Sequence, residues 1–113
     1  MKVLDQNLLS ADIELLKQCK AAITDILPDA EIILYGSRAR GDARPDSDYD
    51  LLVLTDQQTD LDLEDNLRAA VFNFQLEYDV LLSVFAYNRN QWNSPLYRAM
   101  PFHKNIDREG TTV

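Results

Sequence analysis

Apolar residues that recur every three or four positions predict two long helices in this chain. The first begins at Ser10, which can cap it, and runs to about Leu27, with an apolar stripe of Ile13, Leu16, Ile23 and Leu27. The second runs from about Asp60 to Leu76, with a stripe of Leu63, Leu67, Ala70, Val71 and Phe74. Each stripe is wide enough to cover part of an apolar sheet.

Short continuous apolar runs predict three strands, at residues 32–35, 49–54 and 78–85. Gly36 permits a tight turn after the first strand, and residues 37–41 predict a brief helix that ends at a glycine. A last helix is predicted where Ser94 can act as the cap and Pro95 occupies the first position. This order indicates an α/β (α+β) domain, in which helices pack on one face of a small mixed sheet of at least three strands.

The length of 113 residues suits one domain that spans residues 1–113. The net charge of −8 argues against tight binding to long nucleic acid, because neutralised phosphates supply most of that affinity. The single cysteine, Cys19, cannot form an internal disulfide, and we expect it to be buried on a helix face. No apolar stretch has the length of a membrane span or a signal peptide. We therefore expect a cytoplasmic protein with no membrane contact.

Residues 36–50 contain the candidate chemistry. Gly36-Ser37 follows a predicted strand, and after an interval of ten residues Asp48 and Asp50 open the next one. Residues i and i+2 of a strand point to the same face, so these two carboxylates can aim at one point. They repel each other unless a cation lies between them. Mg²⁺ suits such a pair, because it takes one or two carboxylates and completes its shell with water and phosphate oxygens.

At these residues the chain resembles the DNA polymerase β-type nucleotidyltransferase superfamily, and within it the minimal nucleotidyltransferases. The closer resemblance rests on Gly-Ser-Arg-Ala-Arg-Gly at residues 36–41 and Asp-Ser-Asp-Tyr-Asp at residues 46–50. The family likeness covers the chain from about residue 10 to Glu109-Gly110. It implies a polymerase β-like core that transfers a nucleoside monophosphate, with ATP as the substrate. Tyr49 departs from the pattern, in which an aliphatic residue is more usual. We expect this departure to change the packing on the far face of the strand and not the ligand set.

The resemblance also implies a third carboxylate on the neighbouring strand. Asp79 matches it by position, near the start of the strand predicted at residues 78–85, and Glu77 is the alternative on the same face. Asp48, Asp50 and Asp79 would then be the catalytic residues and the metal ligands. Together they would hold two Mg²⁺ ions, which bring the attacking and leaving oxygens together.

Three arginines, Arg38, Arg40 and Arg44, lie close to the Gly-Ser pair and suit a small anionic substrate. Gly36 would let the backbone approach a triphosphate, and amides at the start of the short helix would donate hydrogen bonds to it. The hydroxyl of Ser37 would add another hydrogen bond. Arg40, and with it Arg38, would neutralise the outer phosphates. We expect Arg44 to be a solvent-facing loop residue.

By resemblance, the acceptor would be a HEPN-type toxin, modified on a hydroxyl side chain and silenced, so that the chain would act as its antitoxin. Few residues follow the third predicted strand, so we expect the partner, or a second copy in a homo-oligomer, to complete the acceptor site. Two alternatives stay open. The chain could neutralise a toxin by binding alone, without catalysis, or it could be a nucleotidyltransferase for a small molecule such as an aminoglycoside.

Overall fold

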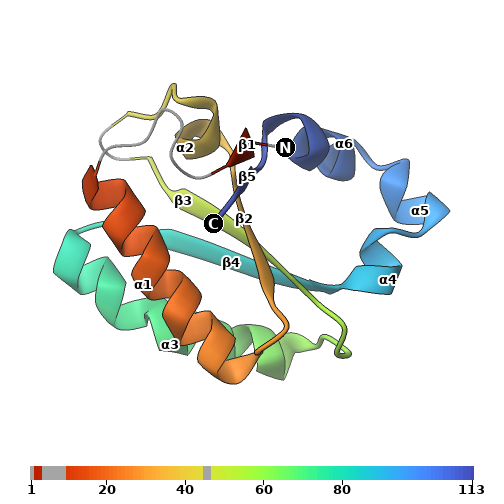
Figure 1. Ribbon diagram of the computed structural model, residues 1–113, viewed down its shortest axis with the longest axis horizontal. Coiled ribbons are helices and arrows are strands. Elements are labelled where there is room, and N and C mark those ends of the chain that lie inside the picture. The colour runs from red at the N-terminus through yellow and green to blue at the C-terminus, as the bar shows by residue number, and fades with distance from the viewer. Residues whose placement is uncertain (1, 4–9, 45–46) are drawn as a thin grey trace.

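The computed structural model describes residues 2–3, 10–44 and 47–113 (Figure 1). The strands are β1 (Lys2–Val3), β2 (Glu31–Tyr35), β3 (Tyr49–Thr55), β4 (Leu82–Asn88) and β5 (Thr111–Thr112). The helices are α1 (Ser10–Ile26), α2 (Ser37–Arg40), α3 (Leu61–Tyr78), α4 (Arg89–Trp92), α5 (Pro95–Arg98) and α6 (Pro101–Glu109). None of the helices described here is long and apolar enough to cross a membrane.

Within the described residues, the five strands form one mixed sheet in the order β1-β5-β2-β3-β4 (Figure 1). β2 runs antiparallel to β3, and β4 runs parallel to β3, with α3 as the crossover between them. In this register Asp50 of β3 lies between Tyr35 of β2 and Ser83 of β4. The expected α/β class with a small mixed sheet is confirmed.

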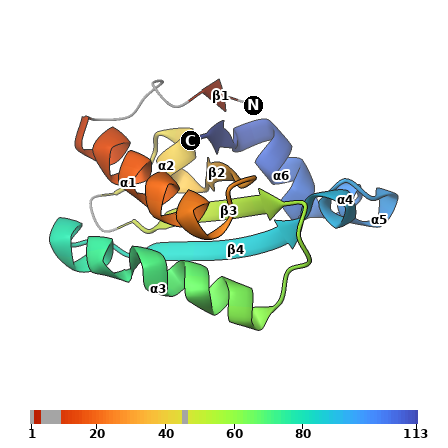
Figure 2. The same cartoon turned by 60° about the horizontal axis from the view of Figure 1, so that its bottom comes forward.

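The two long helices, α1 and α3, pack on one face of the sheet (Figure 2). The core between them and the strands includes Leu15, Leu16, Ile23, Leu34, Leu51, Val53, Leu67 and Val71. Cys19 is fully buried within α1, and burial raises the pKa of its thiol to about 12. Cys19 is therefore a packing residue, as its place on the helix stripe predicted.

The opposite face of the sheet is covered by the short C-terminal helices. Trp92 of α4 and Ile106 of α6 pack against a cluster of sheet residues that consists of Ile33, Leu52 and Leu54. The ring of Trp92 also stacks on His103, with centroids 4.4 Å apart. The sequence predicted helices on one face of the sheet only, whereas the structure has helices on both faces. α4 and α5 have four residues each, too few to show an amphipathic stripe, whereas the nine residues of α6 include Phe102 and Ile106 at helical spacing.

The third predicted strand begins later than expected, so the prediction of a strand from residue 78 was wrong at its start. α3 continues through Tyr78, and Asp79 ends it in the left-handed conformation with φ of 53°. Tyr78 packs against the same core as the α3 stripe, so this segment follows helical and not strand spacing. Pairing with β3 begins where the amide of Tyr49 donates to the carbonyl of Leu81 at 2.9 Å. Glu77 and Asp79 therefore precede β4 and do not lie on it.

Candidate active site

The turn between β2 and α2 places Gly36 against the carboxylate of Asp50. Gly36 has φ of 76° and ψ of −159°, a conformation that L side chains rarely adopt. A Cβ atom at this position would overlap Oδ2 of Asp50. Glycine is therefore required both by the backbone and by the space, and the carboxylate lies directly beside the Gly-Ser turn.

Asp48 and Asp50 are close enough to influence each other. Asp48 is exposed just before β3, whereas Asp50 is half-buried as the second residue of that strand. Burial raises the pKa of Asp50, the negative charge of Asp48 raises it further, and Arg40 lowers it in part. Burial and the charge of Asp50 also raise the pKa of Tyr35 to about 12. This mutual repulsion fits a shared cation, and Mg²⁺ needs only one or two carboxylates from a protein.

Arg38 fastens the loop before β3 to α2. Its Nε and Nη2 atoms donate to the carbonyl of Ser47 at 3.2 and 3.0 Å, and its guanidinium lies 4.4 Å from the centre of the Tyr49 ring. Tyr49 is buried on the α1 side, where its hydroxyl donates to Asp12. The Tyr49 side chain therefore lies on the face of β3 that is turned toward α1. Arg38 holds the backbone immediately before Asp48, and its contact with a phosphate stays a prediction.

Arg40 is held by two carboxylates. Its Nε lies 3.3 Å from Oδ2 of Asp42, and its Nη1 lies 3.2 Å from Oε2 of Glu109 at the end of α6. Hydrogen bonds to Glu109 and Asp42 raise the pKa of the Arg40 guanidinium. Burial acts to raise the pKa of Glu109, but hydrogen bonds from Arg108 and Arg40 outweigh burial and lower it. Arg40 thus lies near Asp50 in a defined position.

The other residues that the sequence analysis considered for this site are Ser37, Arg44 and Asp79, and they make fewer contacts with it. Ser37 begins α2 next to Gly36, and Arg44 is exposed in the loop that follows, as expected. Asp79 is exposed at the turn after α3. Among the described residues, no three Asp, Glu, His or Cys side chains are grouped closely enough to hold a metal ion. Asp79 therefore does not join Asp48 and Asp50 in this arrangement, and the β4 residue beside Asp50 is Ser83.

Sequence reasoning gave no site role to two residues of this region: Tyr35, and Glu109, which it named only as part of the family resemblance. Tyr35 was assigned only to a buried strand, but the antiparallel register places it directly opposite Asp50. Its position as the last residue before the Gly-Ser turn was an available signal. Glu109 lies 69 residues after Arg40, and nothing in the local pattern links the two. Only the tertiary fold brings them together.

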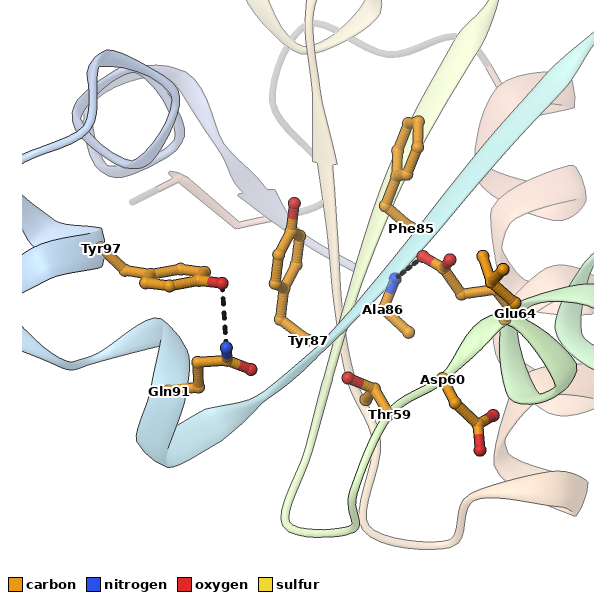
Figure 3. A pocket seen from close by; sticks show the side chains of 9 residues that line it. Thr59, Asp60, Glu64, Phe85, Ala86, Tyr87, Gln91 and Tyr97 are labelled. Carbon is orange, nitrogen blue, oxygen red and sulfur yellow. Dashed lines mark hydrogen bonds between the residues drawn. The ribbon is translucent and has the colours of Figure 1, made fainter.

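A hollow of about 350 Å³ lies at the far end of β4, between the start of α3 and the short helices α4 and α5 (Figure 3). Figure 3 shows Glu64 at its wall, where the carboxylate accepts a hydrogen bond from the amide of Ala86 at 2.9 Å. Gln91 donates to the hydroxyl of Tyr97 at 2.9 Å on the opposite side. Phe85, the lining residue of β4 nearest to Ser83, is two residues from it, which corresponds to roughly 7 Å. The hollow therefore lies further along β4 than Asp48 and Asp50, and neither carboxylate is among its lining residues.

The chain is also similar to known proteins. A family model described as a nucleotidyltransferase domain matches residues 16–111. A protein of Methanocaldococcus jannaschii named "Putative protein adenylyltransferase" is 35% identical over 79 residues, which cover 68% of this chain and 80% of that protein. A solved structure described as a toxin-antitoxin with AMP-PNP superposes with a TM-score of 0.60 at 18% identity, covering 85% of this chain and 69% of the other. This structural likeness confirms the polymerase β-like nucleotidyltransferase fold.

Proposed function

We propose that this chain, which belongs to the nucleotidyltransferase domain family, transfers AMP from ATP to a hydroxyl group of a partner protein. The chain is a nucleotidyltransferase of the minimal type, as its motif indicated. The choice of AMP and of a protein acceptor is supported by the M. jannaschii relative, which is named for that activity. The net charge of −8 further favours a protein over long nucleic acid as the acceptor.

The observation that carries the proposal is the close approach of Gly36, in the Gly-Ser turn, to the carboxylate of Asp50, two residues after Asp48. Because Gly36 lacks a side chain, the carboxylate of Asp50 lies directly against the backbone of the turn, and the triphosphate would bind beside both of them. Asp48 and Asp50 would hold Mg²⁺, and when bound this ion would offset the negative charge that gathers on the phosphate oxygens. The hydroxyl of Ser37 would donate a hydrogen bond to a phosphate, and the guanidinium of Arg40 would neutralise part of the phosphate charge.

In the transfer, the acceptor oxygen forms a bond to the α-phosphorus while the bond from that phosphorus to the bridging oxygen of the β-phosphate breaks. Pyrophosphate leaves, and the acceptor proton passes to a base. Asp79 stays the candidate for this base and for a third metal ligand. It lies two residues before Leu81, whose carbonyl bonds to the amide of Tyr49, so it is at the same end of the sheet as Asp48. A two-ion site would require the turn after α3 to bring Asp79 closer to the pair.

The partner that we propose is a toxin of the HEPN type, which the chain would silence as an antitoxin. Support comes from the likeness to a nucleotide-bound toxin-antitoxin structure and from the motif resemblance. The described surface also exposes large apolar side chains, among them Leu61, Phe72, Leu76 and Leu96. Exposed apolar residues of this kind are available for contact with a partner protein. None of them is next to Asp48 or Asp50 in the sequence.

The proposal is tested by incubating the purified chain with α-labelled ATP, Mg²⁺ and a lysate of its source cell. We expect one labelled protein band, lost with Asp48→Asn or Asp50→Asn and retained with Asp25→Asn, an exposed carboxylate of α1. Label on a small molecule would replace the protein acceptor by a small one. Neutralisation of the toxin in cells by both Asp48→Asn and Asp50→Asn would show instead that binding alone is sufficient. Asp79→Asn in the same assay tests its role as base.

A further inference from the structure

We propose that Glu109 is a positioning residue, which holds the guanidinium of Arg40 in the place where it meets the phosphates of the nucleotide. The inference rests on the proposed nucleotide transfer and assigns to α6 a part in that site. Neither the motif at residues 36–50 nor the family match assigns a role to Glu109.

The contacts of Arg40 orient its guanidinium but use only part of its hydrogen-bond donors. Its Nη1 atom donates to Glu109 at 3.2 Å, and its Nε atom donates to Asp42 at 3.3 Å. An arginine side chain has five N–H donors in a rigid fork, so a guanidinium held along one side can still present donors to a phosphate. Neither of the two ion pairs uses Nη2. The carboxylates thus fix the direction of the fork while part of it stays available.

Glu109 is better placed than Asp42 to act as the fixed partner. The side chain of Glu109 is 19% exposed, whereas that of Asp42 is 64% exposed. Arg108 donates to the second oxygen of Glu109 at 3.2 Å, but its side chain is 69% exposed and therefore orders the carboxylate little. An ion pair between exposed, freely moving side chains orders little, and the more buried partner therefore controls the geometry.

The backbone after Glu109 is anchored to β2, the strand that leads into Gly36. A Cβ atom on Gly110 would lie 2.8 Å from Cγ2 of Ile33 and 2.6 Å from the carbonyl of Ile106, so only glycine allows this close approach. Beyond it, the amide of Val113 donates to the carbonyl of Ile32 at 2.9 Å, next to the β5–β2 pairing. Glu109 therefore moves together with the strand that positions the Gly-Ser turn.

Arg40 also lies one helical turn from Gly36, because its amide donates to the carbonyl of Gly36 at 3.1 Å, and Gly36 lies against the carboxylate of Asp50. The guanidinium is accordingly within electrostatic reach of the place where a phosphate would meet Asp50. Fixing a long side chain before the ligand arrives removes an entropic cost from binding. Loss of Glu109 should therefore weaken nucleotide binding more than it slows the chemical step.

The experiment measures the Kd of Mg·ATP, and KM and kcat for transfer, with wild-type chain, Glu109→Ala, Glu109→Gln and Arg40→Ala. We expect Glu109→Ala to raise Kd and KM about three- to tenfold, the range for releasing one long side chain, with kcat changed less than about twofold. Glu109→Gln, which keeps an oxygen acceptor, should restore part of the loss. Asp25→Asn is the control for loss of one negative charge at an exposed site.

A double-mutant cycle separates positioning from a general structural effect. If Glu109 acts through Arg40, Glu109→Ala should change the Kd little once Arg40 is already alanine. An equal loss in both backgrounds would overturn the inference, because Glu109 would then act on the fold and not through Arg40. Tighter ATP binding by Glu109→Ala would also overturn it, since Glu109 would then compete with the phosphates. A wild-type chain that binds no nucleotide would overturn the proposed function and this inference together.

Discussion

Gly36→Ala provides a sharp test of the site, because a single methyl group meets two independent obstacles. The φ and ψ of Gly36, 76° and −159°, lie in a region that is essentially restricted to glycine, at a cost of about 1–3 kcal/mol for another residue. The added Cβ would also overlap Oδ2 of Asp50 and lie 3.4 Å from its Cγ, so the carboxylate would have to move. A displacement of about 1 Å at a reacting centre can reduce the rate roughly 100-fold. We therefore expect a moderate loss of stability and a severe loss of transfer.

The assay combines thermal unfolding with transfer of labelled AMP under Mg²⁺. At about 4–8 °C per kcal/mol for a domain near this size, the backbone strain should lower the melting temperature by roughly 5–20 °C. Ile23→Val is the matched control, because it loses about 0.5–1.5 kcal/mol from the core beneath α1 without touching the turn. We expect Ile23→Val to keep wild-type transfer below its melting temperature, whereas Gly36→Ala should lose transfer even at temperatures where it is fully folded.

The reasoning would be refuted by a folded Gly36→Ala protein that transfers AMP at a rate near that of the wild type. Such a result would mean that the carboxylate of Asp50 can leave its place beside the turn without consequence. Asp50 could then not be a ligand that the Gly-Ser turn positions. Loss of transfer in proportion to the unfolded fraction, equal in both variants, would likewise assign the effect to stability alone.

Three further predictions concern stability and reactivity. Asp50→Asn should raise the melting temperature of the ligand-free protein at pH 7, because burial and Asp48 disfavour the ionised form; the gain should fade as the pH falls through the raised folded-state pKa of Asp50. Asp29→Asn should lower the free energy of unfolding in urea by about 0.5–1 kcal/mol at pH 7. Hydrogen bonds from the Asp56 amide and the Thr55 hydroxyl hold the pKa of Asp29 down, so this difference should disappear as the pH falls through that lowered pKa. Cys19 should resist thiol reagents in the native protein and react only on unfolding, and Cys19→Ser should cost about 1–3 kcal/mol because it buries a hydroxyl.

The parts of the fold that could be predicted from the sequence are those that depend on residues within a few positions of each other along the chain. The strand, turn, short helix and acidic strand at residues 32–54 were predicted because Gly36, Gly41 and the apolar runs act within a few residues of each other. The long helices were predicted because each has several turns of regular spacing. Where a helical stripe ran on into Tyr78, two patterns competed, and packing against the core decided for the helix. That competition is the reason why Asp79 was assigned to a strand.

Contacts between distant segments could not be predicted in the same way. The helices α4 and α5 are too short to show a stripe, yet aromatic residues of α4–α6 close the second face of the sheet. Tyr35 and Asp50 face each other only because β2 and β3 pair in one particular register. A shift of one residue would have pointed Asp50 into the core. The ligand set of the site can thus be proposed from its motif, whereas its geometry depends on the sheet.

The sheet order also explains how the C-terminal residues come to contribute to the site. β5 lies between β1 and β2, and this places the end of α6 beside the strand that terminates at Gly36. The close approach of Gly110 to Ile33 then brings Glu109 within reach of Arg40. The motif at residues 36–50 does not reveal that Glu109 is the partner of Arg40, because this contact depends on how the C-terminal strand pairs with the sheet. The motif therefore indicates the reaction, and the contact from α6 determines how firmly the arginine beside it is held.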